Sequence, residues 1–79
     1  MLSSEDEEQQ MKKIYNDILL SRDSTEKKKD VNALASYGKK AVPFIQQLRN
    51  IETDEGMKNY MFDAITQIEK VDTLKERLK

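Results

Sequence analysis

Residues 33–48, which read ALASYGKKAVPFIQQL, carry apolar side chains at helical spacing on both sides of a glycine, and a proline follows five residues later. Gly38 can adopt the left-handed backbone conformation that closes a helix C-terminus without a Cβ clash. Pro43 lacks a backbone N–H and is tolerated in the first turn of a helix, so a new helix should begin at about Lys40. The stretch therefore predicts a helical hairpin that turns at residue 38.

The rest of the chain has the same helical character. One proline and two glycines are present in 79 residues, and no stretch shows sustained alternation of apolar and polar residues. We expect a single all-α domain over residues 1–79, of which residues 1–6 form a flexible acidic start. Candidate helix caps are Ser4 in a capping box with Glu7, Asp23 with Glu26, Thr53 or Asp54, and Asp72. Five helices are predicted: the first follows SSEDEE and carries apolar positions from Met11 to Leu19, the second runs to about Tyr37, the third begins at about Lys40, the fourth covers about residues 55–69 and the short fifth covers residues 73–79.

Apolar residues recur every three or four positions in each predicted helix, which is typical of helices with one buried face. The predicted inward positions are Met11, Ile14, Tyr15, Ile18, Leu19, Val31, Leu34, Ala35, Ala41, Phe44, Ile45, Leu48, Met57, Tyr60, Met61, Ala64, Ile65, Ile68, Val71, Leu74 and Leu78.

This pattern also repeats along the chain. Residues 31–38 align with residues 62–69 at an offset of 31, and beyond the turn an offset of 30 matches the third predicted helix with the fifth and with the first. A period of about 30 residues is that of a helix-pair repeat. The spacing indicates two hairpins, each covering the apolar side of the other.

The residues that carry the repeat are Ala33-Leu34, Gly38 and AVPFI at 41–45, with a looser second copy at Asp54, Lys58 and Ala64-Ile65. Over residues 11–79 they resemble the short HEAT-like repeat found in phycobilisome-lyase-type repeat proteins. Departures from that pattern are Asp30, Lys39-Lys40, Met61, Phe62 and Glu69. The resemblance implies antiparallel hairpins stacked as a short α-solenoid, and the alternative is a compact bundle of about five helices.

Composition excludes several classes of function. The chain has no Cys and no His, so it cannot form disulfides, thiolate nucleophiles, imidazole bases or the usual zinc sites. The net charge is −1 and the longest apolar runs span three residues, which disfavours membrane insertion and global attraction to nucleic acid. We expect a cytoplasmic, non-enzymatic protein without cofactor or metal.

The outward positions of the third helix are polar and suit recognition of another protein, since helices in this place form the concave surface of an α-solenoid. A solvated face is the alternative reading. The partner would be another protein, or a second copy of this chain in a homodimer. The candidate binding residues are Gln46, Gln47, Arg49, Asn50, Asn16 and Lys75.

Lysines gather at the other edge of the predicted stack and offer an alternative function, the binding of nucleic-acid phosphates. The lysines at 27–29 lie in a first helical turn, where cations oppose the helix dipole, so local stability does not explain them. Solvated charge is the competing interpretation. The residues of the lysine-rich edge are Lys12, Lys13, Lys39, Lys40 and Lys70.

Overall fold

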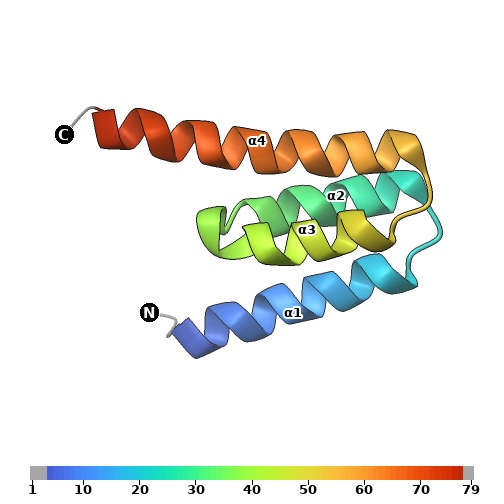
Figure 1. The fold of residues 1–79 in the computed structure, drawn as a ribbon. Coiled ribbons are helices and arrows are strands. Elements are labelled where there is room, and N and C mark those ends of the chain that lie inside the picture. Colours follow the sequence, from blue (N-terminus) through green and yellow to red (C-terminus); the bar gives the residue numbers. More distant parts are fainter. Residues whose placement is uncertain (1–3, 78–79) are drawn as a thin grey trace.

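The computed structural model describes the backbone of residues 4–77 and the side chains of residues 6–71. This part of the chain is an all-α bundle of four α-helices and one short 3₁₀-helix (Figure 1). The elements are α1 (Ser4–Leu20), α2 (Ser24–Ala35), η1 (Gly38–Ala41), α3 (Val42–Ile51) and α4 (Glu55–Arg77).

The hairpin of α2 and α3 lies between the two outer helices, with α1 on one side and α4 on the other (Figure 1). Helices α1 and α3 run in the same direction, and α2 and α4 run in the opposite one. Both described chain ends therefore lie toward the end of the bundle where η1 turns the chain, and the last turns of α4 extend past this turn (Figure 1).

The predicted turn at residue 38 is confirmed. Gly38 has φ +77°, in the left-handed region that a residue with a side chain rarely adopts. Pro43 lies in the first turn of α3. Helix α2 ends at Ala35, two residues earlier than expected, and the N–H of Ser36 donates to Asn32 O at its end.

The predicted fifth helix is wrong as a separate element, because α4 continues without a break from Glu55 to Arg77. Where the first hairpin has Gly38, the equivalent position holds Glu69, and neither Gly nor Pro occurs beyond Gly56. Without a residue that reverses the chain, Asp72 is accommodated inside the helix. The second hairpin indicated by the spacing is thus not formed in the described residues.

The predicted start of α1 also needs correction. Residues 1–3 lie outside the described residues, but residues 4–6, expected to be flexible, belong to α1. The Ser4 side chain, half of the predicted capping box, is likewise not described. The other half, Glu7, accepts a hydrogen bond from Lys40 Nζ at 2.8 Å.

The core lies where the two middle helices meet the outer pair, and the apolar spacing predicted every residue in it. Two expected inward residues are exposed instead, Leu19 by 46% and Val71 by 47%, and the side chains of Leu74 and Leu78 lie outside the described part. The buried residues are Met11, Ile18, Val31, Leu34, Ala41, Ile45, Leu48, Met57, Met61, Ile65 and Ile68.

Of the predicted caps in the middle of the chain, two form. Asp23 Oδ1 accepts from the N–H of Thr25 at 3.1 Å, and Asp54 Oδ2 accepts from the N–H of Met57 at 2.8 Å. Each carboxylate satisfies a backbone donor that a helix start leaves without a partner. None of the described helices combines the length and the apolar character needed to cross a membrane.

Candidate functional site

The outward side of α3 is exposed and polar, as the sequence predicted for Gln46, Gln47, Arg49 and Asn50. Asn16 is also exposed and lies on α1, the parallel neighbour of α3 (Figure 1). These residues come from two adjacent helices, so one partner can contact both.

Lys75 does not join them. It was expected beside α3 as part of a fifth helix, but it lies in the last turns of α4, which runs antiparallel to α3 and extends beyond the hairpin turn (Figure 1). Its side chain lies outside the described part.

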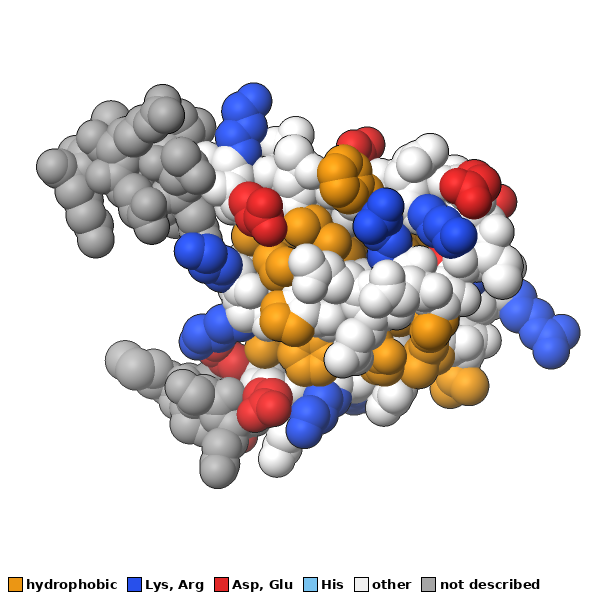
Figure 2. Space-filling model, viewed as in Figure 1, with side chains coloured by type: hydrophobic (Ala, Val, Ile, Leu, Met, Phe, Trp, Pro, Cys, Tyr) orange, Lys and Arg blue, Asp and Glu red, His pale blue; other side chains and the backbone are white. Residues whose placement is uncertain are grey.

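Large apolar side chains are exposed at the C-terminal ends of α1 and α3. Leu20 is 81% exposed and Ile51 57%, and Leu19 and Ile51 line the same small hollow of about 110 Å³. Figure 2 shows a row of hydrophobic side chains along the seam between these helices, beside the white polar atoms of α3. We call the combined surface the α1/α3 face, and define it by Asn16, Leu19, Leu20, Gln46, Gln47, Arg49, Asn50 and Ile51.

Sequence reasoning missed the apolar part of this face. Leu19 was placed in the core, and Leu20 and Ile51 were given no role. A signal was present, because residues 18–20 are three consecutive apolar residues and a helix cannot turn all three toward one core.

An aromatic residue extends the face onto α4. The guanidinium carbon of Arg49 lies 4.9 Å from the centre of the Phe62 ring, and Phe62 is 50% exposed. Such a contact contributes roughly 0.5–1 kcal/mol at an exposed site and fixes the orientation of the guanidinium group. Phe62 was noticed in the sequence only as a departure from the small residue of the repeat pattern.

Three other aromatic residues, which the apolar spacing predicted at inward positions, are half-buried. The rings of Tyr15 and Phe44 meet edge to face between α1 and α3, with their centres 5.9 Å apart. Tyr60 donates a hydrogen bond from its hydroxyl to Asn32 Oδ1 at 2.8 Å, and Lys28 Nζ lies 5.4 Å from the centre of its ring. These contacts join neighbouring helices, which is a packing role.

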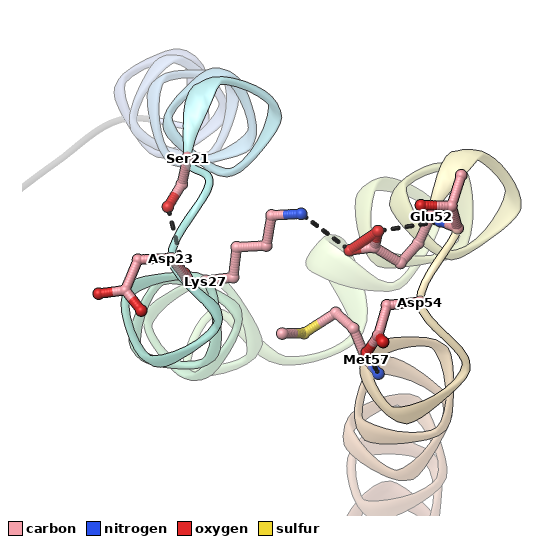
Figure 3. A network of polar contacts seen from close by, with 7 residues as sticks. Ser21, Asp23, Lys27, Glu52, Asp54 and Met57 are labelled. Carbon is pink, nitrogen blue, oxygen red and sulfur yellow. Dashed lines mark hydrogen bonds and ion pairs between the residues drawn. The ribbon is translucent and has the colours of Figure 1, made fainter.

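Near the C-terminal ends of α1 and α3, an ion pair between Lys27 and Glu52 links α2 to the loop after α3. Lys27 Nζ donates to Glu52 Oε1 at 3.0 Å, and the two side chains are only 22% and 9% exposed (Figure 3). Burial alone would raise the pKa of Glu52, but the hydrogen bond from Lys27, the N–H groups of Thr53 and Asp54 and the positive charge together lower it. Lys27 therefore has a structural role that the sequence did not reveal.

The residues of the lysine-rich edge are partly neutralised by carboxylates of α1. Lys40 Nζ lies 2.8 Å from Glu7 Oε2, and Lys12 Nζ lies 3.6 Å from Glu8 Oε1. Lys13, Lys39 and Lys70 are exposed on α1, η1 and α4. In Figure 2 the basic side chains are spread among acidic ones and form no continuous patch on the face shown.

The charged form of one further carboxylate, that of Asp30, is disfavoured by its surroundings. The pKa of Asp30 is raised by partial burial and by repulsion from Asp17 on α1 and Glu26 on its own helix. Among the described residues, no group of three or more acidic side chains is arranged to hold a metal ion.

In comparisons with protein-family models, with curated proteins and with solved structures, nothing matches this chain.

Proposed function

We propose that this chain is a small, non-enzymatic protein–protein interaction module of the HEAT-like repeat type, and that another protein binds its α1/α3 face. The cytoplasmic location expected from the sequence stays a prediction.

The observation that carries the proposal is the position of exposed leucine and isoleucine beside polar residues. Scattered apolar residues are normal on a protein surface, but Leu19 and Ile51 share one hollow, and the exposed Leu20 follows Leu19 at the end of α1. Burial of such a side chain contributes about 1.5–3 kcal/mol when it is complete. Gln47 and Asn50 on the same helix then supply the polar rim that protein interfaces place around a few apolar anchors.

Arg49 adds a second kind of anchor. Arginine and aromatic residues are enriched among the residues that contribute most to binding. The stacking of Arg49 on Phe62 lowers the entropy that the long side chain would lose on binding, because the group is already oriented.

The parallel arrangement of α1 and α3 supports the HEAT-like part of the proposal. In an α-solenoid, equivalent helices of successive hairpins lie side by side and create the binding surface. Here α1 and α3, which precede and follow α2 in the chain, run parallel to each other as the equivalent helices of two successive hairpins would (Figure 1).

Binding of nucleic-acid phosphates by the lysine-rich edge is the alternative, and it has less support. Lys40 and Lys12 already face Glu7 and Glu8, so a phosphate would have to compete with carboxylates of the same chain. If the edge did bind phosphates, binding would fall steeply with salt and would be lost when Lys39 and Lys40 are changed to Glu.

The test is affinity capture from a lysate of the native host with three forms of the chain, followed by measurement of each recovered protein's affinity for them. The wild type is compared with the double variant Leu20→Lys/Ile51→Lys, in which two exposed anchors become charged. The control is Ala33→Lys, which adds one lysine at an exposed position of α2, behind α3 in Figure 1.

We expect a partner that binds the wild type and the control equally and binds the double variant at least tenfold more weakly. A partner that binds all three forms equally would place the interaction elsewhere. Recovery of nucleic acid in place of a protein partner would favour the lysine-rich edge.

A further inference from the structure

A shallow groove runs between α2 and α4, on the side of α4 away from Phe62 and α3. Two adjacent hollows of about 490 and 210 Å³ form it, and both are lined by Asn32, Ala64 and Gln67. The larger hollow is also lined by Ala35 and Gly38. Ala35, Gly38 and Ala64 have a small side chain or none, so the backbone of another helix can approach closely at these positions.

Asp63 of α4 lines the smaller hollow, and Lys70, which has the opposite charge, follows it along the helix. Asp63 and Lys70 are both exposed and are seven residues apart, which is two helical turns or about 10.5 Å along one side of the helix. Gln67 lies between them. Val71 follows, 47% exposed at the edge of the larger hollow.

We propose that a second copy of this chain docks in the groove, with the two α4 helices antiparallel about a two-fold axis near Gln67. In that arrangement Asp63 lies opposite the partner's Lys70, and Lys70 lies opposite the partner's Asp63. The same symmetry brings Val71 over the turn that contains the partner's Ala64, so an exposed apolar side chain enters an unfilled hollow. The contact is self-complementary, as a two-fold interface must be.

The charge pattern favours a second copy over other occupants. A helix that is acidic along its whole contact would be repelled by Asp63, and a uniformly basic one by Lys70. A partner needs both signs, two turns apart and in the reverse order, and the antiparallel copy of α4 provides them. The groove lies between α2 and α4, whereas the α1/α3 face consists of residues of α1 and α3, so this inference does not depend on the proposed function.

Sedimentation equilibrium of the full chain tests the dimer, from about 10 μM to 1 mM. The variants are Asp63→Lys and Lys70→Asp, each alone and mixed in equal amounts. Each variant alone places like charges opposite each other twice, whereas the mixed dimer again pairs opposite charges at both points. The control is Lys13→Asp, an exposed lysine of α1 with the same change of charge.

We expect a reversible dimer for the wild type and the control, at least tenfold weaker association for each variant alone, and recovery in the mixture. Circular dichroism should show unchanged helix content, because both positions are exposed. A wild type that is monomeric up to about 1 mM overturns the proposal. A mixture that associates no better than its components, or a control as weak as Lys70→Asp, also overturns it.

Discussion

Replacement of Lys27 by Met tests whether the ion pair with Glu52 holds the loop after α3 against α2. Methionine keeps most of the apolar stem but removes the charge and the hydrogen bond to Glu52 Oε1. The carboxylate, 9% exposed, would keep the N–H of Thr53 at 3.0 Å but lose its charged partner. A hydrogen bond to a charged group contributes about 1.5–3 kcal/mol, and breaking a fully buried pair costs about 3–5 kcal/mol. Because Lys27 is still 22% exposed, we expect a loss of about 1.5–3 kcal/mol.

Urea unfolding followed by circular dichroism measures this loss, and Lys12→Met is the matched control. Lys12 pairs with Glu8 at 3.6 Å on the surface of α1, with side chains 61% and 57% exposed. A pair of that kind contributes at most about 0.5 kcal/mol. Equal losses in the two variants would refute the reasoning that burial makes the Lys27–Glu52 pair strong.

The dependence on pH provides an independent check. The folded-state pKa of Glu52 lies below its ordinary value of 4.5, so its contribution is complete above that value and is lost as pH falls through the folded-state pKa. The gap in unfolding free energy between wild type and Lys27→Met should therefore be full near neutral pH and shrink below about pH 4. A gap that stays constant on acidification would show that the ion pair does not cause it.

Three further changes test the fold by the same urea assay. Gly38→Ala should lower the free energy of unfolding by about 1 kcal/mol, because φ is +77°; no atom lies near the added Cβ, so no steric clash adds to this cost. Gly38→Asn should cost less, because Asn tolerates the left-handed conformation better, and equal losses in the two variants would contradict this explanation. Asp30→Asn should stabilise the chain near pH 7 by about 0.2–0.5 kcal/mol, since it removes a like-charge pair with Glu26. The raised pKa of Asp30 means that this gain should vanish in acid, where the carboxyl is protonated. Met61→Ala, at a position 1% exposed, should cost about 2–5 kcal/mol, whereas Leu20→Ala, at 81% exposure, should cost under about 0.5 kcal/mol.

The hairpin could be predicted because its determinants are local. Gly38 turns the chain just after the end of α2 through its own backbone freedom, and Pro43 marks a helix start through its missing N–H. The spacing of apolar residues likewise predicted the buried positions, since a residue's place on a helix follows from the helical period. Neither inference needs information from a distant part of the chain.

The candidate site was harder to predict because it depends on contacts between distant segments. Lys27 and Glu52 are 25 residues apart, and only the folded bundle brings them within 3.0 Å. Arg49 and Phe62 likewise lie on different helices, and only the folded bundle brings the guanidinium group over the ring. Helical period also gives the direction of a buried face but not its width, so Leu19 was assigned to the core although its position falls at the edge.

The continuity of α4 links the failed part of the prediction to the proposed dimer. With Asp72 as the cap of a separate fifth helix, the sequence predicts Val71 at an inward position. A cap residue ends one helix only where the backbone also turns, and Glu69, unlike Gly38, does not favour a turn. The unbroken helix leaves Val71 half exposed at the edge of the larger hollow, directly after Lys70 in the chain. Because α4 continues past Glu69, Asp63, Lys70 and Val71 stay on one uninterrupted helix, which the antiparallel pairing of two α4 helices requires.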